Sequence, residues 1–174
     1  MDRLFAPWRI EWVEREEDPI EGCPFCVLPE RDAREARIVA RNDGAFVLLN
    51  NYPYNPGHVM VVPDRHTGEY TDLADEELLA HTRLKQRTLR ALEAGLGPDG
   101  VNAGLNLGGA AAGGSINDHV HEHVVPRWEG DTNFMPVVGD AKVIVEALDR
   151  TYDRLADAFA EQAGASAGSG AVRF

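Results

Sequence analysis

Three histidines at alternate positions are the residues of this chain with the clearest capacity for chemistry. His119, His121 and His123 stand in the run His-Val-His-Glu-His-Val-Val-Pro. Successive side chains of a strand project to opposite faces, so residues two apart project together. The spacing therefore predicts one strand with three imidazoles on a single face. With a pKa of about 6.5, an imidazole can act near neutral pH as nucleophile, proton carrier or neutral metal ligand.

The residues alone leave three interpretations of this cluster open. A single histidine on a strand is usually a structural residue, but repetition at period two beside a glycine-rich stretch favours a functional site. One functional interpretation is a nucleophile with proton-carrying neighbours. The other is a zinc site, because alternate histidines on a strand can bind zinc together and leave a position for water.

A glycine-rich segment just before the histidines is suited to binding a phosphate. Residues 108–115 read Gly-Gly-Ala-Ala-Ala-Gly-Gly-Ser and connect two predicted strands. Without bulky side chains, backbone N–H groups can approach a ligand closely. Such a segment alone is more often a flexible turn. Beside the histidines it predicts an anion site made of oriented amides, Ser115, Asn106 and the imidazoles.

Both cysteines of the chain lie in the motif Cys23-Pro24-Phe25-Cys26. In a cytoplasmic protein this spacing is typical of half a tetrahedral zinc site or of a redox pair, and a structural disulfide is not expected. A redox pair belongs at a strand-to-helix turn of a βαβ unit, which the surrounding sequence does not suggest. We therefore favour zinc, with two further ligands to be supplied, over a redox pair or plain buried thiols.

Length and composition exclude some classes of function. The 174 residues can bury one sizeable core, so one domain is expected. The formal charge is −12, and only Lys85 and Lys142 are lysines among the 17 basic residues. Such a surface repels nucleic-acid phosphates. No run approaches the roughly 18 apolar residues of a membrane span, and Met1–Phe5 lacks the layout of a secretory signal. The expectation is a cytoplasmic protein with neither a membrane nor a nucleic-acid partner.

The excess of acids over lysines also predicts adaptation to high salt. A large net charge opposes association, and salt screens its self-repulsion. The sequence therefore favours a halophilic protein.

Apolar periodicity predicts an α+β fold, an antiparallel sheet with two main helices. The predicted strands are 38–40, 45–49, 58–62, 101–107 and the histidine run, and the predicted helices are 73–94 and 141–159. In the first helix, the residues expected to face the core are Leu78, Thr82, Leu89 and Leu92. Lys85 interrupts that stripe.

The same pattern divides the chain into three segments. Residues 1–35 carry weak periodicity and the cysteine pair, so an irregular segment anchored by zinc is expected. Residues 36–160 form the main domain. Residues 161–174 are rich in Ala, Gly and Ser and predict a flexible C-terminal tail.

The histidine run matches the pattern of the histidine triad (HIT) superfamily, in which histidines alternate with mostly apolar residues. Leu49–Pro63, with its Pro-Gly-His turn, resembles the strand and turn before the first helix of that family. Four short motifs resemble the diadenosine tetraphosphate (Ap4A) phosphorylase-like branch more narrowly: Ala6–Arg9, Cys23–Cys26, Gly114–Ser115 and Pro126–Trp128. The resemblance runs from about Leu4 to Leu155.

The resemblance implies a homodimeric, nucleotide-binding enzyme that cleaves its substrate at the α-phosphate. His121 would be the nucleophile that forms a nucleotidyl-imidazole intermediate, and His123 would lie against the phosphate. His119 would instead be a zinc ligand. The other implied zinc ligands are Cys23, Cys26 and His66. The implied nucleotide contacts are Asn50 at the ribose, Asn106, Gly114 and Ser115 at the phosphates, and Trp128 at the base.

Two departures from the family pattern refine these expectations. Hydrolases and phosphoramidases of the superfamily often carry glutamine where this chain has Ser115, which favours a phosphorylase or transferase. Glu122 replaces a commonly apolar residue and points away from the histidines, so we expect it to be paired or to lie at a subunit boundary. Three classes of function remain: a nucleotidyl-transfer enzyme, a metallohydrolase that uses all three histidines, and a nucleotide-binding sensor without turnover.

Overall fold

A six-stranded sheet forms the frame of the molecule in the computed structural model, which describes residues 21–108, 111–112, 116, 118–131, 147–166 and 170–174. In these ranges the α-helices are α2 (Pro24–Val27), α3 (Asp75–Leu96) and α5 (Leu148–Ala160), and the strands are β1 (Ile38–Arg41), β2 (Ala45–Leu49), β3 (Val59–Pro63), β4 (Gly100–Leu105), β5 (Glu122–Arg127) and β6 (Val172–Arg173). Short 3-10 turns occupy Leu28–Glu30 and Tyr70–Asp72. The predicted α+β class is confirmed.

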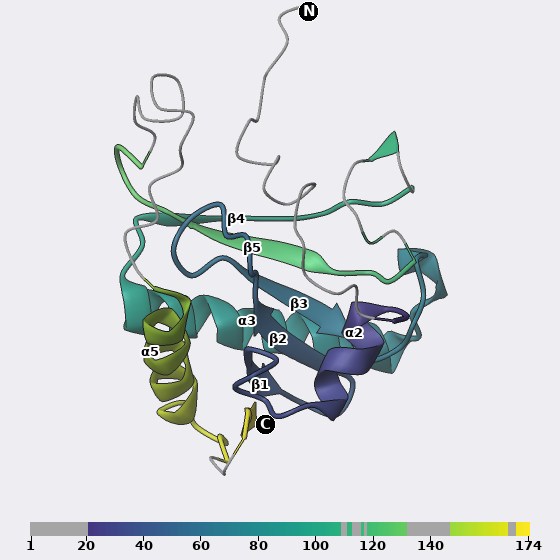
Figure 1. Ribbon diagram of the computed structural model, residues 1–174, viewed down its shortest axis with the longest axis horizontal. Coiled ribbons are helices and arrows are strands. Elements are labelled where there is room, and N and C mark those ends of the chain that lie inside the picture. The colour runs from purple at the N-terminus through teal and green to yellow at the C-terminus, as the bar shows by residue number, and fades with distance from the viewer. Residues whose placement is uncertain (1–20, 109–110, 113–115, 117, 132–146, 167–169) are drawn as a thin grey trace, which may run out of the picture.

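The strand order in the sheet is β4-β5-β3-β2-β1-β6. The pairs from β4 to β1 are all antiparallel, whereas the last pair, β1 with β6, is parallel. Figure 1 shows β4 at one edge and the C-terminus beside β1 at the other. The histidine strand β5 is therefore an inner strand, held by hydrogen bonds on both sides.

Helices cover both faces of the sheet (Figure 1). α3 and α5 cover one face, where the strands contribute Val47, Leu49, Val59, Val61 and Val124. The short α2 packs on the other face through Phe25, in a cluster that includes Ile38, Phe46, Leu48 and Val62. The alternation of these residues along β2 and β3 assigns each strand position to one face, as period-two patterning predicts.

Helix α3 runs close to its predicted bounds but turns a different face to the core. The carboxylate of Glu77 accepts the Ala74 N–H at 2.8 Å at the start, and Gly97 ends the helix with φ 62°. Its buried residues are His81, Leu84, Thr88, Ala91 and Leu92. The expected stripe is wrong at Thr82 and Leu89, which are exposed.

The physical reason is that polar residues occupy part of the buried stripe. Nε2 of His81 lies 3.3 Å from the carbonyl oxygen of Val61, and the Thr88 hydroxyl donates to the Leu84 carbonyl at 2.9 Å. These bonds offset part of the free-energy cost of burying the two polar side chains, although Nδ1 of His81 is buried without a hydrogen-bond partner. A count of apolar residues alone cannot detect such positions.

The chain end also differs from the flexible tail expected from its composition. Val172 is buried in β6, and the Phe174 N–H donates to the Arg41 carbonyl at 3.0 Å. The guanidinium of Arg87 lies over the Phe174 ring, 4.0 Å from its centroid. A short apolar end therefore anchors a segment whose composition is otherwise that of a linker.

Two expectations fall partly outside the described residues. Helix α5 confirms the predicted last helix from Leu148 onward, while residues 141–146 lie outside the described ranges. The first 20 residues lie outside them as well.

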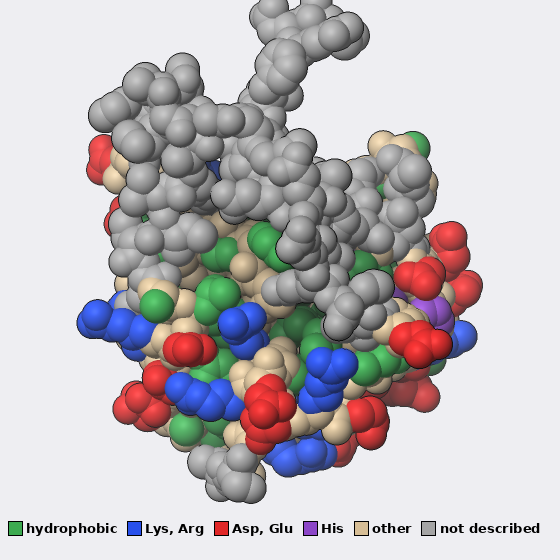
Figure 2. All heavy atoms as spheres, viewed as in Figure 1, with side chains coloured by type: hydrophobic (Ala, Val, Ile, Leu, Met, Phe, Trp, Pro, Cys, Tyr) green, Lys and Arg blue, Asp and Glu red, His purple; other side chains and the backbone are tan. Residues whose placement is uncertain are grey.

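Among the described helices, none is long and apolar enough to cross a membrane. Figure 2 shows basic and acidic side chains interspersed over the described part of one face.

Candidate functional site

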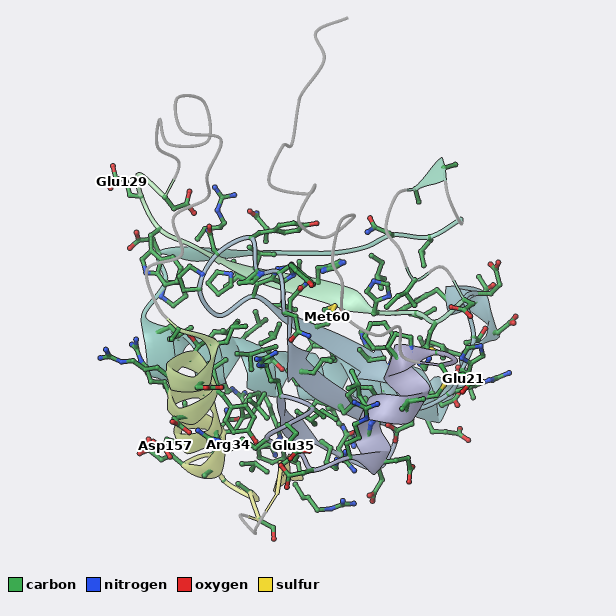
Figure 3. All side chains as sticks on the ribbon, in the orientation of Figure 1. Glu21, Arg34, Glu35, Met60, Glu129 and Asp157 are labelled. Carbon is green, nitrogen blue, oxygen red and sulfur yellow. The ribbon has the colours of Figure 1, made fainter. Side chains whose placement is uncertain are left out.

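The three histidines project toward the α2 side of the sheet, although only the third lies within a strand. β5 begins at Glu122, so His119 and His121 belong to the segment that leads into it, which bends at His119. His123 pairs across the sheet with Met60 of β3, which Figure 3 labels. The imidazole rings of His121 and His123 have centroids 5.1 Å apart. The expectation of one continuous strand was therefore too long, but the shared face is correct.

The hydrogen bond of His121 defines which of its nitrogens can react. Nδ1 of His121 lies 2.9 Å from the backbone carbonyl oxygen of His119. A carbonyl only accepts, so Nδ1 carries the hydrogen and Nε2 carries the lone pair. The side chain is 6% exposed. His121 is thus a buried imidazole whose Nδ1 is occupied by the backbone, so Nε2 is the nitrogen available to act as a nucleophile or base.

A fourth histidine, His58, fixes the tautomer of His123 in the same way. The Tyr54 N–H donates to Nδ1 of His58 at 3.1 Å, so His58 carries its hydrogen on Nε2. That nitrogen lies 2.9 Å from Nδ1 of His123, which must accept. His123 therefore carries its own hydrogen on Nε2. The hydrogen bonds thus run from the Tyr54 N–H through His58 to His123, and they make the Nε2–H of His123 a donor beside His121.

Sequence reasoning did not single out His58 as a site residue. It was assigned to the start of a strand and to a Pro-Gly-His turn. The sequence does show that His58 stands two residues before Met60 and so shares a strand face with it. Only the structure shows that Met60 lies opposite His123.

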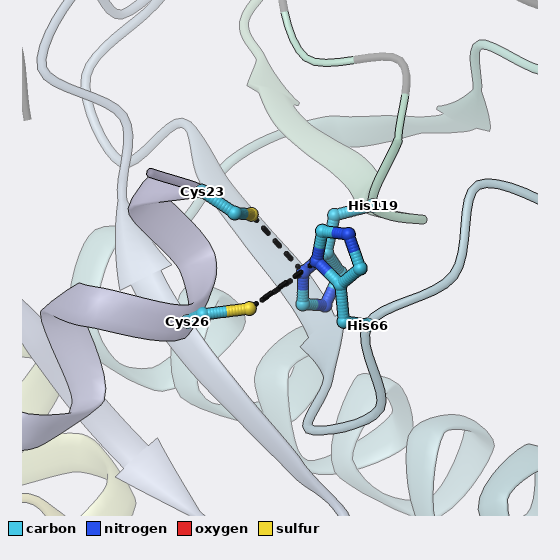
Figure 4. Close-up of side chains that lie close together, drawn as sticks. All are labelled: Cys23, Cys26, His66 and His119. Carbon is cyan, nitrogen blue, oxygen red and sulfur yellow. Dashed lines mark hydrogen bonds between the residues drawn. The ribbon is translucent and has the colours of Figure 1, made fainter. Parts of the chain in front are cut away.

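Four side chains form what we call the metal-ligand group: Cys23, Cys26, His66 and His119. Figure 4 shows the two cysteines projecting from the α2 turn toward the two imidazoles. Nδ1 of His119 lies 3.4 Å from Sγ of Cys23 and 3.7 Å from Sγ of Cys26, and Nδ1 of His66 lies 3.3 Å from Sγ of Cys26. All four ligand atoms lie within 4.8 Å of one another. Sulfur and nitrogen ligands of a tetrahedral zinc ion are about 3.6 Å apart, so the donor set fits.

Neighbouring groups orient the two imidazoles of this group. Nε2 of His119 donates to the Pro63 carbonyl at 2.8 Å, which leaves Nδ1 as the ligand atom. Nε2 of His66 lies 3.8 Å from a carboxylate oxygen of Asp118. Burial lowers the pKa of His119 and so favours the neutral form that a metal requires. The structure thus brings together the four residues that the resemblance implied as ligands.

The sequence-predicted nucleotide contacts have different outcomes. Asn50 follows β2 and accepts the Tyr52 N–H at 2.8 Å through its side-chain oxygen. Asn106 follows β4 two positions after Gly104, the residue paired with His123, so it continues the histidine side of the sheet. Gly114 and Ser115 lie outside the described residues.

Trp128 is the one described contact that the structure separates from the histidines of its own chain. It follows the opposite end of β5, five residues beyond His123, or about 17 Å along a strand. Its indole N–H donates to the Gly97 carbonyl at 3.2 Å. The turn around it is held by Asp131, which accepts from Arg127 at 2.8 Å and from Asn55 at 2.7 Å.

Glu122 lies on the opposite side of β5 and is paired, as expected. It is 6% exposed, and Lys85 of α3 donates to its carboxylate at 3.1 Å. His81 lies 3.7 Å from the same carboxyl group, and burial lowers the pKa of that histidine. Glu122 therefore joins β5 to α3 and does not face the histidine side.

Alternating histidines, a glycine turn that leads into the adjacent strand and a sheet covered by one long helix define a protein of the histidine triad class. The HIT domain model matches residues 31–130, more than half of the chain, and the chain therefore belongs to the HIT domain family.

Known relatives agree with this assignment. The AP-4-A phosphorylase of Mycobacterium tuberculosis is 40% identical over 169 residues, which cover 93% of this chain and 86% of that protein. Among solved structures, a Zn-bound histidine triad family protein from Mycobacterium smegmatis has a TM-score of 0.64 and 28% identity, covering 80% of this chain and 94% of that one. A hypothetical histidine triad nucleotide-binding protein from Sulfolobus tokodaii has a TM-score of 0.61 and 25% identity, covering 80% and 90%.

Proposed function

We propose that this protein is a nucleotidyl-transfer enzyme that cleaves dinucleoside polyphosphates of the Ap4A type through a covalent nucleotidyl intermediate on His121. The observation that carries the proposal is the hydrogen bond from Nδ1 of His121 to the His119 carbonyl, because it leaves Nε2 as the nucleophilic nitrogen. The name of the M. tuberculosis relative supports the substrate class.

The proposed reaction has two displacement steps. Nε2 of His121 attacks the α-phosphorus, the bond from that phosphorus to the bridging oxygen breaks, and ATP leaves Ap4A. His123, oriented by His58, donates a hydrogen bond from Nε2 as charge develops on the phosphoryl group. An acceptor then attacks the adenylyl-His121: orthophosphate yields ADP, and water yields AMP. Ser115 in place of glutamine favours orthophosphate.

The remaining ligand contacts are part of the same proposal. Asn50 contacts the ribose, while Asn106, Gly114 and Ser115 contact the phosphates. Trp128 contacts the base. Because Trp128 and His121 lie toward opposite ends of β5, this contact requires either a substrate that spans the strand or the Trp128 of a second subunit. Cys23, Cys26, His66 and His119 hold one structural zinc ion, a choice that the Zn-bound M. smegmatis structure supports.

We also propose a cytoplasmic homodimer. β4 is an edge strand of the sheet, and most of its residues are exposed. An open strand edge is a ready site for pairing with another chain, which supports a dimer. Residues 1–35 then act as a metal-anchored segment on the main domain.

Product analysis of Ap4A with and without orthophosphate tests the proposed reaction. With orthophosphate we expect ATP and ADP in equal amounts, and without it ATP and AMP at a lower rate. The matched control is His81→Ala, a buried histidine on the other side of the sheet, which should keep the product pattern. Symmetric cleavage of Ap4A to two ADP in the absence of orthophosphate would overturn attack at the α-phosphorus.

The same experiment separates the two other classes of function. Turnover that a chelator abolishes at once, with no adduct on His121, supports a metallohydrolase that uses all three histidines. Tight AMP binding without any product supports a nucleotide sensor. The geometry favours neither, because His119 alone of the three lies with the cysteines.

A further inference from the structure

One aromatic ring lies between the metal-ligand group and the candidate nucleophile. Phe25, which stands between the two cysteines in the sequence, contacts the His119 ring edge-on at a centroid distance of 5.5 Å. The same ring lies 5.0 Å from the ring of His121. Phe25 is 3% exposed, so its position is set by close packing.

The turn that carries Phe25 has little stability of its own. α2 consists of four residues, with the N–H groups of Cys26 and Val27 donating to the Cys23 carbonyl at 3.0 and 3.1 Å. Isolated helices this short do not persist in water, because nucleation is unfavourable. The turn is therefore held by the apolar contacts of Phe25 and by the contacts of the two thiols with His119 and His66. A metal on Cys23 and Cys26 would fix the turn to these two imidazoles.

The ring of His121 depends on its neighbours for its orientation. The bond to the His119 carbonyl restrains the ring at one atom, Nδ1. Two described rings flank it, Phe25 at 5.0 Å and His123 at 5.1 Å. His119, whose carbonyl accepts from His121, belongs to the metal-ligand group. Phe25 stands between the two cysteines of the same group, so both contacts of His121 depend on where this group lies.

We propose that Phe25 is a positioning residue for His121, and that a metal held by the two cysteines fixes the orientation of the nucleophile through Phe25 and the His119 carbonyl. The metal then controls the reaction without touching substrate. This inference rests on the proposed function only in its kinetic test, which uses Ap4A cleavage. Loss of the metal lowers kcat by misorienting His121 and leaves KM nearly unchanged, because neither Phe25 nor a metal ligand is among the proposed nucleotide contacts.

Phe25→Leu tests the positioning role against a matched control, Phe46→Leu. Both changes remove a buried aromatic ring from the same apolar cluster, but Phe46 lies on β2. For zinc-loaded proteins with Ap4A, we expect Phe25→Leu to lower kcat about ten-fold or more through misorientation, with KM within about two-fold and metal content unchanged. Phe46→Leu should lower the melting temperature and keep kcat. Equal kcat values for the two variants would overturn the proposal.

A second readout needs no nucleotide. Diethyl pyrocarbonate modifies unprotonated imidazole, and peptide mass mapping gives its rate at His121. We expect this rate to rise several-fold in zinc-loaded Phe25→Leu but not in Phe46→Leu, and to rise in the wild type when the metal is removed with a chelator. An unchanged rate in Phe25→Leu would contradict the positioning role. Absence of Ap4A turnover in the wild type would instead remove the proposed function and leave this test valid.

Discussion

At the scale of single residues, the site is defined by where hydrogens lie on four imidazoles. Each of His58, His119 and His121 has one nitrogen paired with a backbone group, and this pairing fixes the other nitrogen. In the proposed function, the same side-chain type thereby serves as proton donor, metal ligand and nucleophile. Environment, not residue identity, assigns these roles.

His58→Phe tests the proposed orientation of His123. The variant keeps a ring against Tyr54, whose centroid lies 4.7 Å from that of His58, but removes the bond to His123. We expect kcat for Ap4A to fall about 10²-fold, because general acid–base groups contribute about 10²–10⁴-fold. Steady-state kinetics give kcat and KM, and KM should change little.

His81→Phe provides the control for this prediction. His58 and His81 are each 1% exposed, but His81 bonds to Val61 from α3. We expect a lower melting temperature with kcat preserved. A His58→Phe enzyme as active as the His81→Phe enzyme would remove His58 from the mechanism.

At the scale of elements, the bounds of β1 to β4 could be predicted closely, whereas β6 and the long-range pairs could not. Alternation in Val59–Pro63 shows which residues share a face, because that rule is local. The pairing of Glu122 with Lys85 depends on how α3 crosses β5, and the burial of Val172 depends on a free edge at β1. Resemblance supplied the metal-ligand set. It did not supply Phe25 or His58, whose roles appear only through contacts across the fold.

The β6 strand predicts an effect of truncation. Removal of residues 170–174 exposes the edge of β1 and deletes the buried Val172. We expect a lower melting temperature in thermal unfolding, since burying one valine contributes about 1.5–3 kcal/mol. The exposed Arg173 supplies the control, because Arg173→Ala should leave stability nearly unchanged. An unaltered melting temperature after truncation would support the flexible tail that composition suggested.

The turn after β5 predicts a pH-dependent contribution to stability. The Arg127 guanidinium, which donates to Asp131 at 2.8 Å, is the first cause of the lowered pKa of that carboxyl group. Because the pKa is lower in the folded than in the unfolded chain, the interaction stabilises above pH about 4 and is lost as pH falls below that value.

Asp131→Asn therefore lowers the melting temperature at pH 7 by about 2–4 °C, as expected for about 1 kcal/mol in a chain of this size. The difference from the wild type should narrow as pH falls below about 4. Asp43→Asn, whose side chain is 95% exposed, should show no such effect. A difference that stays constant from pH 7 to pH 3 would contradict the role of the ion pair.

At the scale of the whole molecule, the charge of −12 sets how the fold responds to salt. Salt screens repulsion among exposed carboxylates and so favours the compact state. We expect the midpoint of thermal unfolding to rise as KCl is raised from about 0.1 M, where the Debye length is about 10 Å, toward molar concentrations. A midpoint that falls over this range would argue against the halophilic interpretation.

The proposed function depends most directly on attack at phosphorus by Nε2 of His121. The direct measurement is intact-protein and peptide mass spectrometry of zinc-loaded enzyme, quenched at alkaline pH within the first turnover of Ap4A. We expect one adenylyl group per chain, acid-labile and located on His121, and none in His121→Ala. Turnover without any adduct, or an adduct on another residue, would contradict it.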